Sequence, residues 1–300
     1  MCKIHTPEVV VLMSTYNGER HLVEQIESIL NQEGVDVRLM IRDDGSNDKT
    51  VEIARKYTDD VVIGENIGYR YSFLELIKNA PEADYYALAD QDDIWLPKKL
   101  ISAVEMISSE TRSHSHNIPI LYTCRRKNYI NGEIVEPTEL KPFINYPFNG
   151  FNNGISVQGC TIVMNRCLKH LVGQFKPNDL QMDHDTWINQ VCRAIGGKVI
   201  LDNRPWLIYR IENNTVGIPR HRISNRILGL FKKQPEYAKS VGNNLLCGYS
   251  CLMPDTNIEI CKKLINYKEN KFSLLFDKRA YYGNFAIKVY RFFAIMTNSL

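Results

Sequence analysis

Three carboxylates lie within four residues of one another, at Asp90, Asp92 and Asp93, directly after the apolar run 85–89. Carboxylates this close repel one another, and a bound divalent cation would offset that repulsion. Ligand atoms that are all oxygen favour Mg²⁺ or Mn²⁺ over zinc, and Mg²⁺ commonly binds substrate phosphates in addition to one or two carboxylates. The cluster therefore predicts a metal ion that neutralises a diphosphate and stabilises its departure. The alternative is a helix-capping Asp with solvated neighbours.

Polar clusters also follow three other apolar runs. They are Thr15-Tyr16-Asn17-Gly18-Glu19, Asp43-Asp44-Gly45-Ser46 and Asn66-Ile67-Gly68. Ligands of open parallel sheets bind at the carboxyl ends of the strands, where such clusters would meet. One cluster alone is equally consistent with an ordinary turn, because turns are rich in Asn, Asp and Gly. The chain contains no Gly-x-x-x-x-Gly-Lys-Ser/Thr motif, which argues against ATPase chemistry.

Strands and helices must alternate to bring these clusters to one edge of a sheet. Short apolar runs predict strands at 8–13, 37–41, 61–63 and 85–89. Helical spacing and capping residues predict helices at 22–30, after Asp48, at 71–79 and from Trp95 onward. This alternation predicts an α/β fold with a doubly wound, mostly parallel sheet. Farther along we expect a hairpin at Asn131-Gly132, a long loop over 137–153 and mainly helical structure over 223–300.

The composition is that of a globular protein. Of 300 residues, 44% are hydrophobic and 24% charged, which excludes the disordered, collagen-like and coiled-coil classes. No apolar run reaches the length of about 18 residues that a transmembrane helix needs, and the first residues lack the apolar segment of a signal peptide. The eight cysteines lack metal-binding spacing, which favours reduced, packed thiols. We therefore expect a cytoplasmic protein.

The formal net charge of +3 hides an asymmetry, because residues 1–219 carry −6 and residues 220–300 carry +9. Acidic groups suit a metal site, whereas a basic surface suits an anionic partner. One side of a predicted helix at 285–296 carries Phe285, Val289, Phe292, Phe293 and Met296, with Lys288 and Arg291 near its edge. This pattern predicts an interfacial helix on an anionic membrane, and an ordinary packed helix is the alternative. Nucleic acid is disfavoured as a partner, because no recognition module accompanies the charge.

Residues 9–100 resemble the inverting GT-A glycosyltransferases of family 2. The resemblance rests on the segments 14–19, 42–50, 66–68 and 89–100 (STYNGE, RDDGSNDKT, NIG and ADQDDIWLPKKL). The form DQDDIW, together with GCTIVMN at 159–165 and HDTW at 184–187, is similar to the bacterial rhamnosyltransferase-like branch. It implies a GT-A catalytic domain at 1–219, with a nucleotide-binding half at 1–108 and an acceptor half at 109–219. A basic, mainly helical region at 220–300 would follow.

The resemblance assigns the donor nucleotide to the first half. Tyr16 would lie beside the base, Asp44 would accept the N3–H of uracil or thymine, and Asp92 would bind the metal ion. Asp43 would shape its turn. The donor contacts implied in this way, Asp43 included, are completed by Thr15, Asn17, Glu19, Asn66, Gly68, Arg70, Asp90 and Arg210. The branch usually carries a His in the segment 209–217, which has none here. Glu212, Asn214 or His221 would have to replace it.

The acceptor side is implied by the second half. Gly159 and Cys160, with Asp183, His184 and Trp187, would form the sugar and acceptor pocket. Asp185 would be the catalytic base, which removes the proton of the acceptor hydroxyl as that oxygen attacks the anomeric carbon and inverts its configuration. An Asp is ionised at neutral pH and can act as a base. Asp183 is the rival base, and a helix N-cap is the structural alternative for Asp185.

The sequence thus predicts an inverting, metal-dependent hexosyltransferase. It would move a sugar, for example rhamnose from dTDP-rhamnose, onto a glycan or lipid-linked acceptor during synthesis of a bacterial surface polysaccharide. Its expected location is the cytoplasm, peripheral at the inner face of the cell membrane. The alternatives are a UDP-hexose-dependent transferase on the same fold, a sugar nucleotidyltransferase and a non-catalytic glycan-binding module. The nucleotidyltransferase loop is absent after the first strand, and intact Asp92 and Asp185 argue against a non-catalytic module.

Overall fold

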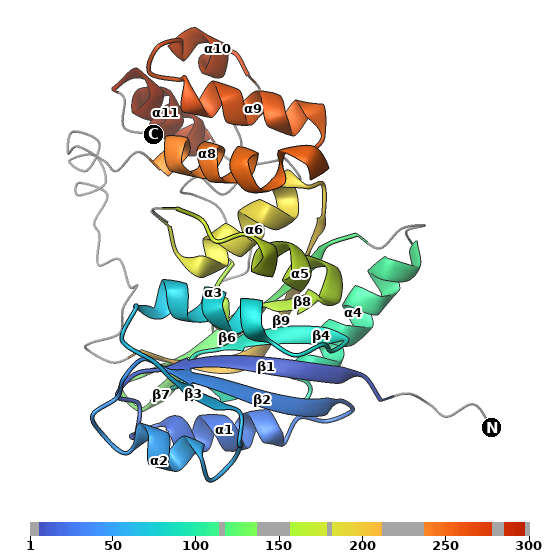
Figure 1. Ribbon diagram of the computed structural model, residues 1–300, viewed down its shortest axis with the longest axis vertical. Coiled ribbons are helices and arrows are strands. Elements are labelled where there is room, and N and C mark those ends of the chain that lie inside the picture. Colours follow the sequence, from blue (N-terminus) through green and yellow to red (C-terminus); the bar gives the residue numbers. More distant parts are fainter. Residues whose placement is uncertain are drawn as a thin grey trace. The chain divides into compact units, whose positions relative to one another are not determined.

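The computed structural model describes residues 6–113, 118–136, 157–178, 182–211, 237–277 and 285–297. They divide into two compact units (Figure 1). The first unit falls within 1–140, 157–176 and 197–213, and the second within 141–156, 177–196 and 214–300. This division differs from the predicted boundary after residue 219, because helix α6 (His184–Ala194) packs with the C-terminal helices.

The first unit is built on a nine-stranded sheet in the order β3-β2-β1-β4-β8-β6-β9-β5, with β7 paired to β6. Its strands are β1 (Glu8–Thr15), β2 (Asp36–Asp43), β3 (Val61–Ile63), β4 (Tyr85–Ala89), β5 (Ile94–Trp95), β6 (Ile120–Ile130), β7 (Glu133–Val135), β8 (Val163–Asn165) and β9 (Lys198–Ile211). Strands β3, β2, β1 and β4 are parallel, as predicted. Strand β8 is antiparallel to β4 and β6, and β5 is antiparallel to β9. The predicted α/β fold is confirmed.

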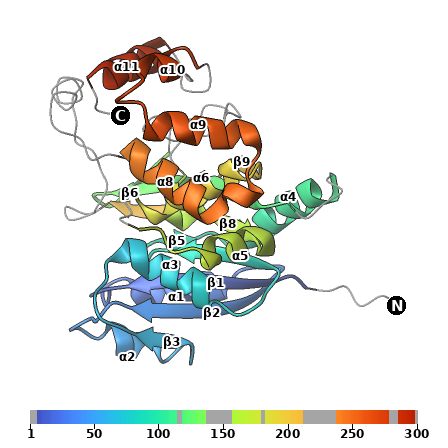
Figure 2. The same cartoon turned by 45° about the horizontal axis from the view of Figure 1, so that its top comes forward.

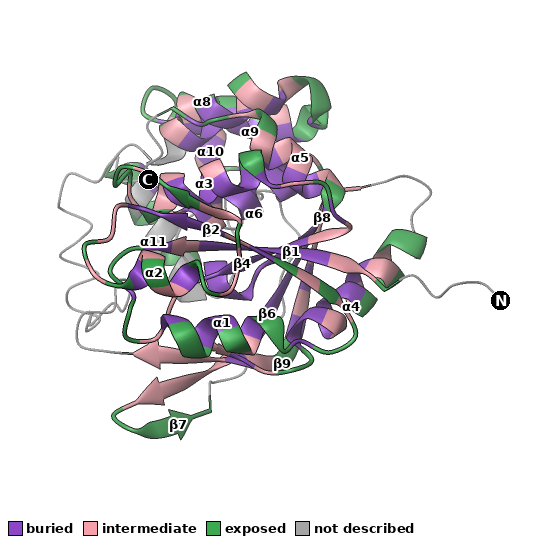
Figure 3. Ribbon diagram, turned by 60° about the horizontal axis from the view of Figure 1, so that its bottom comes forward, coloured by how far each residue is buried: buried purple, intermediate pink, exposed green. Residues whose placement is uncertain are grey.

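Helices cover both faces of this sheet (Figure 3). They are α1 (Leu22–Leu30), α2 (Thr50–Ala54), α3 (Tyr69–Asn79), α4 (Lys99–Ser113) and α5 (Arg166–Gln174), with a 3₁₀ turn η1 (Gly159–Thr161) before β8. Helices α3 and α5 pack beside each other on one face, and α1 and α4 lie on the other. Because both faces are covered, the centre of β1 from Val9 to Met13 is a continuous apolar run with no exposed surface.

The core of the first unit follows from the alternation of side chains along β1. Val9, Val11 and Met13 share one face and belong to the same apolar cluster as Leu22 and Ile26 of α1. Leu22 and Ile26 are four residues apart, so they lie on one side of the helix. Burying each such side chain contributes about 1.5–3 kcal/mol of free energy. This core fixes the positions of the loops that follow β1, β2 and β4.

Two local predictions differ in outcome. The hairpin at Asn131-Gly132 is confirmed, because both residues have positive φ (51° and 91°), as a two-residue type I′ turn between β6 and β7 requires. The helix predicted from Trp95 begins instead at Lys99, because Ile94 and Trp95 pair with β9 as a short strand. The loop predicted over 137–153 lies outside the described residues.

The second unit is helical in its described residues. It contains α6, α8 (Tyr237–Tyr249), α9 (Asp255–Ile265), α10 (Lys271–Leu275), α11 (Phe285–Met296) and the 3₁₀ turn η2 (Ser250–Leu252), with α8 and α9 side by side (Figure 2). The buried Trp187 of α6 packs on Tyr249 of α8, with ring centroids 6.2 Å apart. Asn257 of α9 donates a 2.9 Å hydrogen bond to the carbonyl of Ala194. Within the described ranges, no helix has the length and apolar character needed to span a membrane.

Candidate active site

The loops after β1 and β2 are joined by hydrogen bonds. The hydroxyl of Thr15 donates to the Asp43 carboxylate at 2.8 Å, and both side chains are buried. The same carboxylate accepts the backbone N–H of Ser46 at 2.8 Å and its hydroxyl at 2.6 Å. Gly45 has φ +81°, a conformation that glycine adopts without strain. Asp43 therefore holds the turn after β2 through these hydrogen bonds.

The remaining predicted residues of the β1 loop differ in exposure and partners. The Asn17 side-chain oxygen accepts the backbone N–H of Asn47 at 2.9 Å, and a Glu19 carboxylate oxygen accepts that of Lys49 at 3.0 Å. Both side chains therefore hold the two loops together. The Tyr16 side chain is 45% exposed, which leaves its ring accessible to a flat ligand.

Asp44 is buried and forms an ion pair with the buried Arg42. Arg42 also donates to the Ser72 hydroxyl and to the Glu65 carbonyl, both at 3.3 Å. A buried carboxylate needs such compensation, because taking an unpaired charge out of water is costly. The predicted contact between Asp44 and a pyrimidine base stays a prediction.

The turn before α3 carries the other donor candidates of the first half. The exposed Asn66 accepts the backbone N–H of Gly68 at 3.0 Å. Gly68 has φ +79° at the position before the helix begins. The half-buried Arg70 lies over the Tyr69 ring, 5.7 Å from its centroid.

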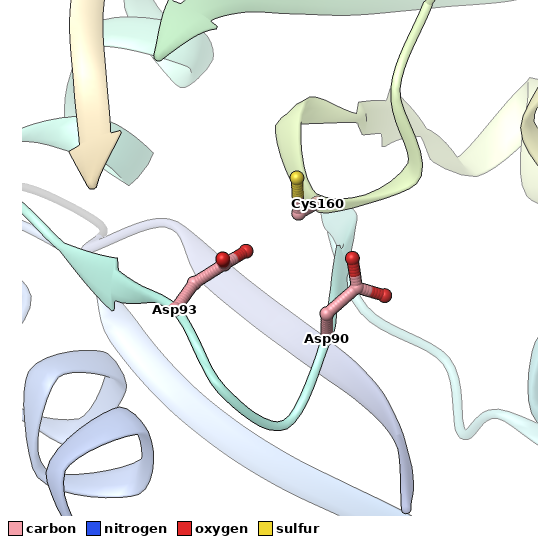
Figure 4. Close-up of side chains that lie close together, drawn as sticks. All are labelled: Asp90, Asp93 and Cys160. Atoms are coloured by element: carbon pink, nitrogen blue, oxygen red, sulfur yellow. The ribbon is translucent and has the colours of Figure 1, made fainter. Parts of the chain in front are cut away.

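Asp90, Asp93 and Cys160 face one another (Figure 4), and one oxygen or sulfur atom of each lies within 4.8 Å of the others. The two carboxylates come from the turn between β4 and β5, and the thiol comes from η1. Asp93 is 1% exposed. Its burial, and next the charges of Asp90 and Asp92, raise the pKa of Asp93 well above its usual range, while Cys160 and Arg126 oppose that rise.

This arrangement fits a divalent cation. Within the described residues, no N–H or O–H group donates to either oxygen of the buried Asp93. A cation would supply the missing compensation for carboxylates that otherwise repel one another. Asp92, the predicted metal ligand, lies half-buried on the same turn but outside the close group of three. The sequence reasoning missed Cys160 as a neighbour of Asp93, because no spacing rule connects residues 67 positions apart.

Lys99 is a buried cation near this cluster. Its amine lies 3.2 Å from the centroid of the Trp95 ring and has no hydrogen-bond partner within the described residues. Burial lowers the pKa of Lys99 from the ordinary 10.5 to about 8, although Asp93 and the buried thiols oppose the change. A lowered pKa means that the charged form of the amine lowers the free energy of unfolding.

That effect leads to a stability prediction. Between pH 8 and 10.5 the unfolded chain binds more protons at Lys99 than the folded chain, so the free energy of unfolding rises with pH in this range. Below pH 8 the charged Lys99 lowers the free energy of unfolding by its full amount. We expect Lys99→Met to raise the free energy of unfolding at pH 7 by about 3 kcal/mol, and by less at pH 9.5. Chemical denaturation at the two pH values measures the difference. Lys98→Met, at an exposed neighbouring position, is the control and should change little. An equal gain at both pH values would contradict the explanation.

Gly159 and Cys160, which the sequence places in the acceptor pocket, are both buried in η1. Burial, and next the charge of Asp93, raise the pKa of the Cys160 thiol. Arg210 of β9, predicted to contact phosphate, forms an ion pair with Glu24 of α1. The residues proposed to replace the missing His, at 212, 214 and 221, lie outside the described residues.

The candidate base belongs to the second unit. Asp185 lies in the first turn of α6, and its carboxylate accepts the backbone N–H of Thr186. The N-cap position falls on Asp183, whose side chain makes no capping hydrogen bond. The N-cap alternative for Asp185 is therefore wrong. His184 and Trp187 are buried at 5% and 0% exposure, so Trp187 is part of the core of this unit.

A pocket of about 450 Å³ lies elsewhere in the first unit. Its lining includes Pro7, which precedes β1, and Asp84 and Tyr85, where β4 begins. The predicted site residues follow the strands instead. The pocket is therefore at the opposite edge of the sheet from the carboxylates.

The mostly parallel sheet with helices on both faces is the fold of the GT-A class. Residues 10–172 match the family described as glycosyl transferase family 2, and the chain belongs to this family. The dTDP-rhamnosyl transferase RfbG of Shigella flexneri is 29% identical over 226 residues, which cover 68% of this chain and 73% of RfbG.

Two further proteins extend the comparison. The UDP-Glc:alpha-D-GlcNAc-diphosphoundecaprenol beta-1,3-glucosyltransferase WfaP of Escherichia coli is 23% identical over 274 residues, covering 88% of this chain and 98% of WfaP. The crystal structure of S. aureus TarS 1-349 in complex with UDP superposes with a TM-score of 0.57 and 17% identity. The superposition covers 89% of this chain and 75% of TarS. At that identity, TarS supports the fold alone.

Proposed function

We propose that the chain is an inverting, metal-dependent glycosyltransferase that uses a nucleoside-diphosphate sugar. The observation that carries the proposal is the pair formed by the half-buried Asp90 and the buried Asp93 where β4 ends, with no N–H or O–H donor to Asp93 among the described residues. Two carboxylates in this state suit a divalent cation, Mg²⁺ or Mn²⁺, that also binds a diphosphate. When bound, the cation stabilises the negative charge of the leaving diphosphate. Asp92, with Asp90 and Asp93 beside it, would hold the cation.

The donor is proposed to be dTDP-rhamnose, and a UDP-hexose is the alternative. RfbG, by its name, uses a dTDP-rhamnosyl donor, which favours the first. The exposed Tyr16 ring and the buried Asp44 supply a stacking surface and an acceptor for the N3–H of a pyrimidine base. The same contacts would serve thymine and uracil equally well.

The acceptor is proposed to be a glycan or a lipid-linked sugar of a bacterial surface polysaccharide. The name of WfaP includes a diphosphoundecaprenol acceptor, which supports a lipid-linked acceptor for this chain. Asp185 would accept the proton of the acceptor hydroxyl, and attack on the side opposite the diphosphate would invert the anomeric carbon. Asp183 is the other carboxylate at the start of α6 and stays the rival base.

A panel of nucleotide sugars tests the proposed donor. UDP-, dTDP- and GDP-sugars are each added to the protein with Mg²⁺ or Mn²⁺, and the unfolding temperature is measured. A ligand that binds only the folded state stabilises it by mass action, so the true donor should raise the unfolding temperature in proportion to the logarithm of its concentration. We expect a dTDP- or UDP-sugar to do so and a GDP-sugar not to. Stabilisation by the GDP-sugar alone would contradict the proposed base contact.

We also propose that the second unit touches an anionic membrane surface. On α11, Phe292, Phe293 and Met296 are 45%, 50% and 44% exposed, and Lys288 is exposed as well. Phe272 of α10 and Phe276, which directly follows this helix, are 69% and 83% exposed. Exposed aromatic rings beside basic residues suit the boundary between lipid headgroups and acyl chains. The side chains of Phe285 and Arg291, which the sequence also assigned to this surface, lie outside the described ones.

Vesicle binding checks this membrane contact. We expect the full chain to co-sediment with phosphatidylserine vesicles at low salt, and the double variant Phe292→Ser, Phe293→Ser to bind about fivefold less, because it loses apolar burial. Ile134→Ser is the control, because Ile134 is 53% exposed on the β6–β7 hairpin, which belongs to the first unit. Binding that the double variant leaves unchanged would rule out this surface. A concentration-dependent dimer that the variant abolishes would assign the rings to a second copy of the chain instead.

A further inference from the structure

Strand β6 carries three consecutive cations, Arg125, Arg126 and Lys127, in its half-buried second part. Lys127 pairs with Glu136, with nitrogen and oxygen 2.7 Å apart. The pairing of β6 with β9 shifts register between Cys124 and Arg125 and again between Arg125 and Lys127, so Arg126 lies at an irregularity of the ladder. Such irregularities re-aim side chains and are common beside active sites.

Arg126 is held over the ring of Tyr209 on β9, with its guanidinium carbon 3.5 Å from the ring centroid. In the antiparallel pair of β5 and β9, Ile94 lies across from Ile208, so Asp93 and Tyr209 are the next residues at the end of this pair. Arg126 stacks on Tyr209, and Tyr209 follows the residue that pairs beside Asp93. The strand order therefore places Arg126 near the carboxylate cluster. A guanidinium stacked on an aromatic ring keeps its N–H groups free at its edge.

Among the side chains that the structure describes, none forms an ion pair with Arg126. Its described contact is the Tyr209 ring. Its positive charge lowers the pKa of Asp93, of Cys160 and of Tyr209, in each case against larger effects that raise it. The field of Arg126 thus reaches the carboxylate cluster without neutralising it through direct contact.

Arg210 provides a contrast on the same pair of strands. It forms an ion pair with Glu24, and its guanidinium carbon lies 5.6 Å from the Tyr129 ring centroid. An arginine already paired with a carboxylate has to give up that partner before it binds a phosphate. No carboxylate in the described part of the chain pairs with Arg126, so it is the better placed of the two cations to bind a phosphate.

We infer that Arg126 is a binding residue for the diphosphate of the donor, with Tyr209 as the platform that orients its guanidinium. The inference rests on the proposed nucleotide-sugar function and names a residue that neither the sequence pattern nor the family motifs single out. A guanidinium presents paired N–H donors that match phosphate oxygens, and it binds them more strongly than a neutral donor does. It would act beside the carboxylates that hold the cation.

The test compares a nucleoside diphosphate with the nucleoside alone. Binding of UDP and uridine, and of dTDP and thymidine, is measured by calorimetry with Mn²⁺ present. We expect Arg126→Gln to weaken diphosphate binding about tenfold and to leave nucleoside binding unchanged, because the nucleoside lacks the anionic group. Arg126→Lys should recover part of the loss. Lys127→Gln, which removes a neighbouring cation already paired with Glu136, should have no effect on either ligand.

The outcomes separate the two proposals. If the wild-type chain binds diphosphates and Arg126→Gln binds them equally well, or loses nucleoside and diphosphate binding to the same extent, the role of Arg126 is wrong and the proposed function stands. If the wild-type chain binds none of the diphosphates, the proposed donor class itself fails. An unfolding temperature close to that of the wild-type protein shows that each variant is folded.

Discussion

Asp185→Asn is expected to reduce the rate of sugar transfer by about 10³-fold, within the range that a general base contributes. Asn has nearly the shape of Asp but cannot accept the proton of the acceptor hydroxyl at neutral pH. The helix should persist, because the N-cap position belongs to Asp183 and not to Asp185. Donor binding should therefore stay at the wild-type level. The loss should appear in kcat, measured with saturating donor and acceptor.

Asp183→Asn is the matched control, because it removes the other carboxylate at the start of the same helix. If Asp185 is the base, Asp183→Asn should keep most of the activity. The opposite result, with Asp183→Asn inactive and Asp185→Asn active, would move the base to Asp183. Full activity in both single variants would remove α6 from the proposed mechanism.

The second large effect is expected from the carboxylates near the cation. Asp92→Asn should lower activity by about 10³-fold or more, because losing stabilisation of the departing diphosphate raises the barrier to transfer by several kcal/mol. It should also weaken Mn²⁺ binding, measured by calorimetry in the presence of a nucleoside diphosphate. Glu52→Gln is the control, since Glu52 is an exposed acid paired with Lys56 on α2.

Asp93→Asn distinguishes two assignments of the metal ligand. The sequence motif points to Asp92, whereas the structure groups Asp93 with Asp90 and Cys160. If Asp93→Asn loses Mn²⁺ binding and Asp92→Asn retains it, the ligand is Asp93. Mn²⁺ binding and activity that survive in both variants would contradict the metal proposal as a whole.

The sequence predicted what local patterns control. The apolar run from Val9 to Met13 is a strand buried on both faces, and the turn residues Asn131 and Gly132 form the expected hairpin. The side-chain network around Asp43 was likewise predictable, because Asp followed by Gly and Ser after a strand favours such a turn.

The remaining features depend on long-range strand order. The sequence pattern predicts that a helix starts at Trp95, but Trp95 pairs with β9, a strand more than a hundred residues later. The same pairing brings Tyr209 toward Asp93, the pairing of β6 with β9 places Arg126 over Tyr209, and η1 brings Cys160 beside Asp93. Lys99 is fully buried, although lysine side chains are mostly exposed. No periodicity in the sequence encodes these contacts, because they arise when distant strands join one sheet.

The anomeric configuration of the sugar released from the donor tests the central claim most directly. Proton NMR is recorded while the protein hydrolyses the donor that stabilises it, with water as the acceptor, early enough to precede mutarotation. We predict that the first sugar formed has the anomeric configuration opposite to that of the donor, and that Asp185→Asn forms it about 10³-fold more slowly. A sugar released with the donor's own configuration would contradict direct inversion.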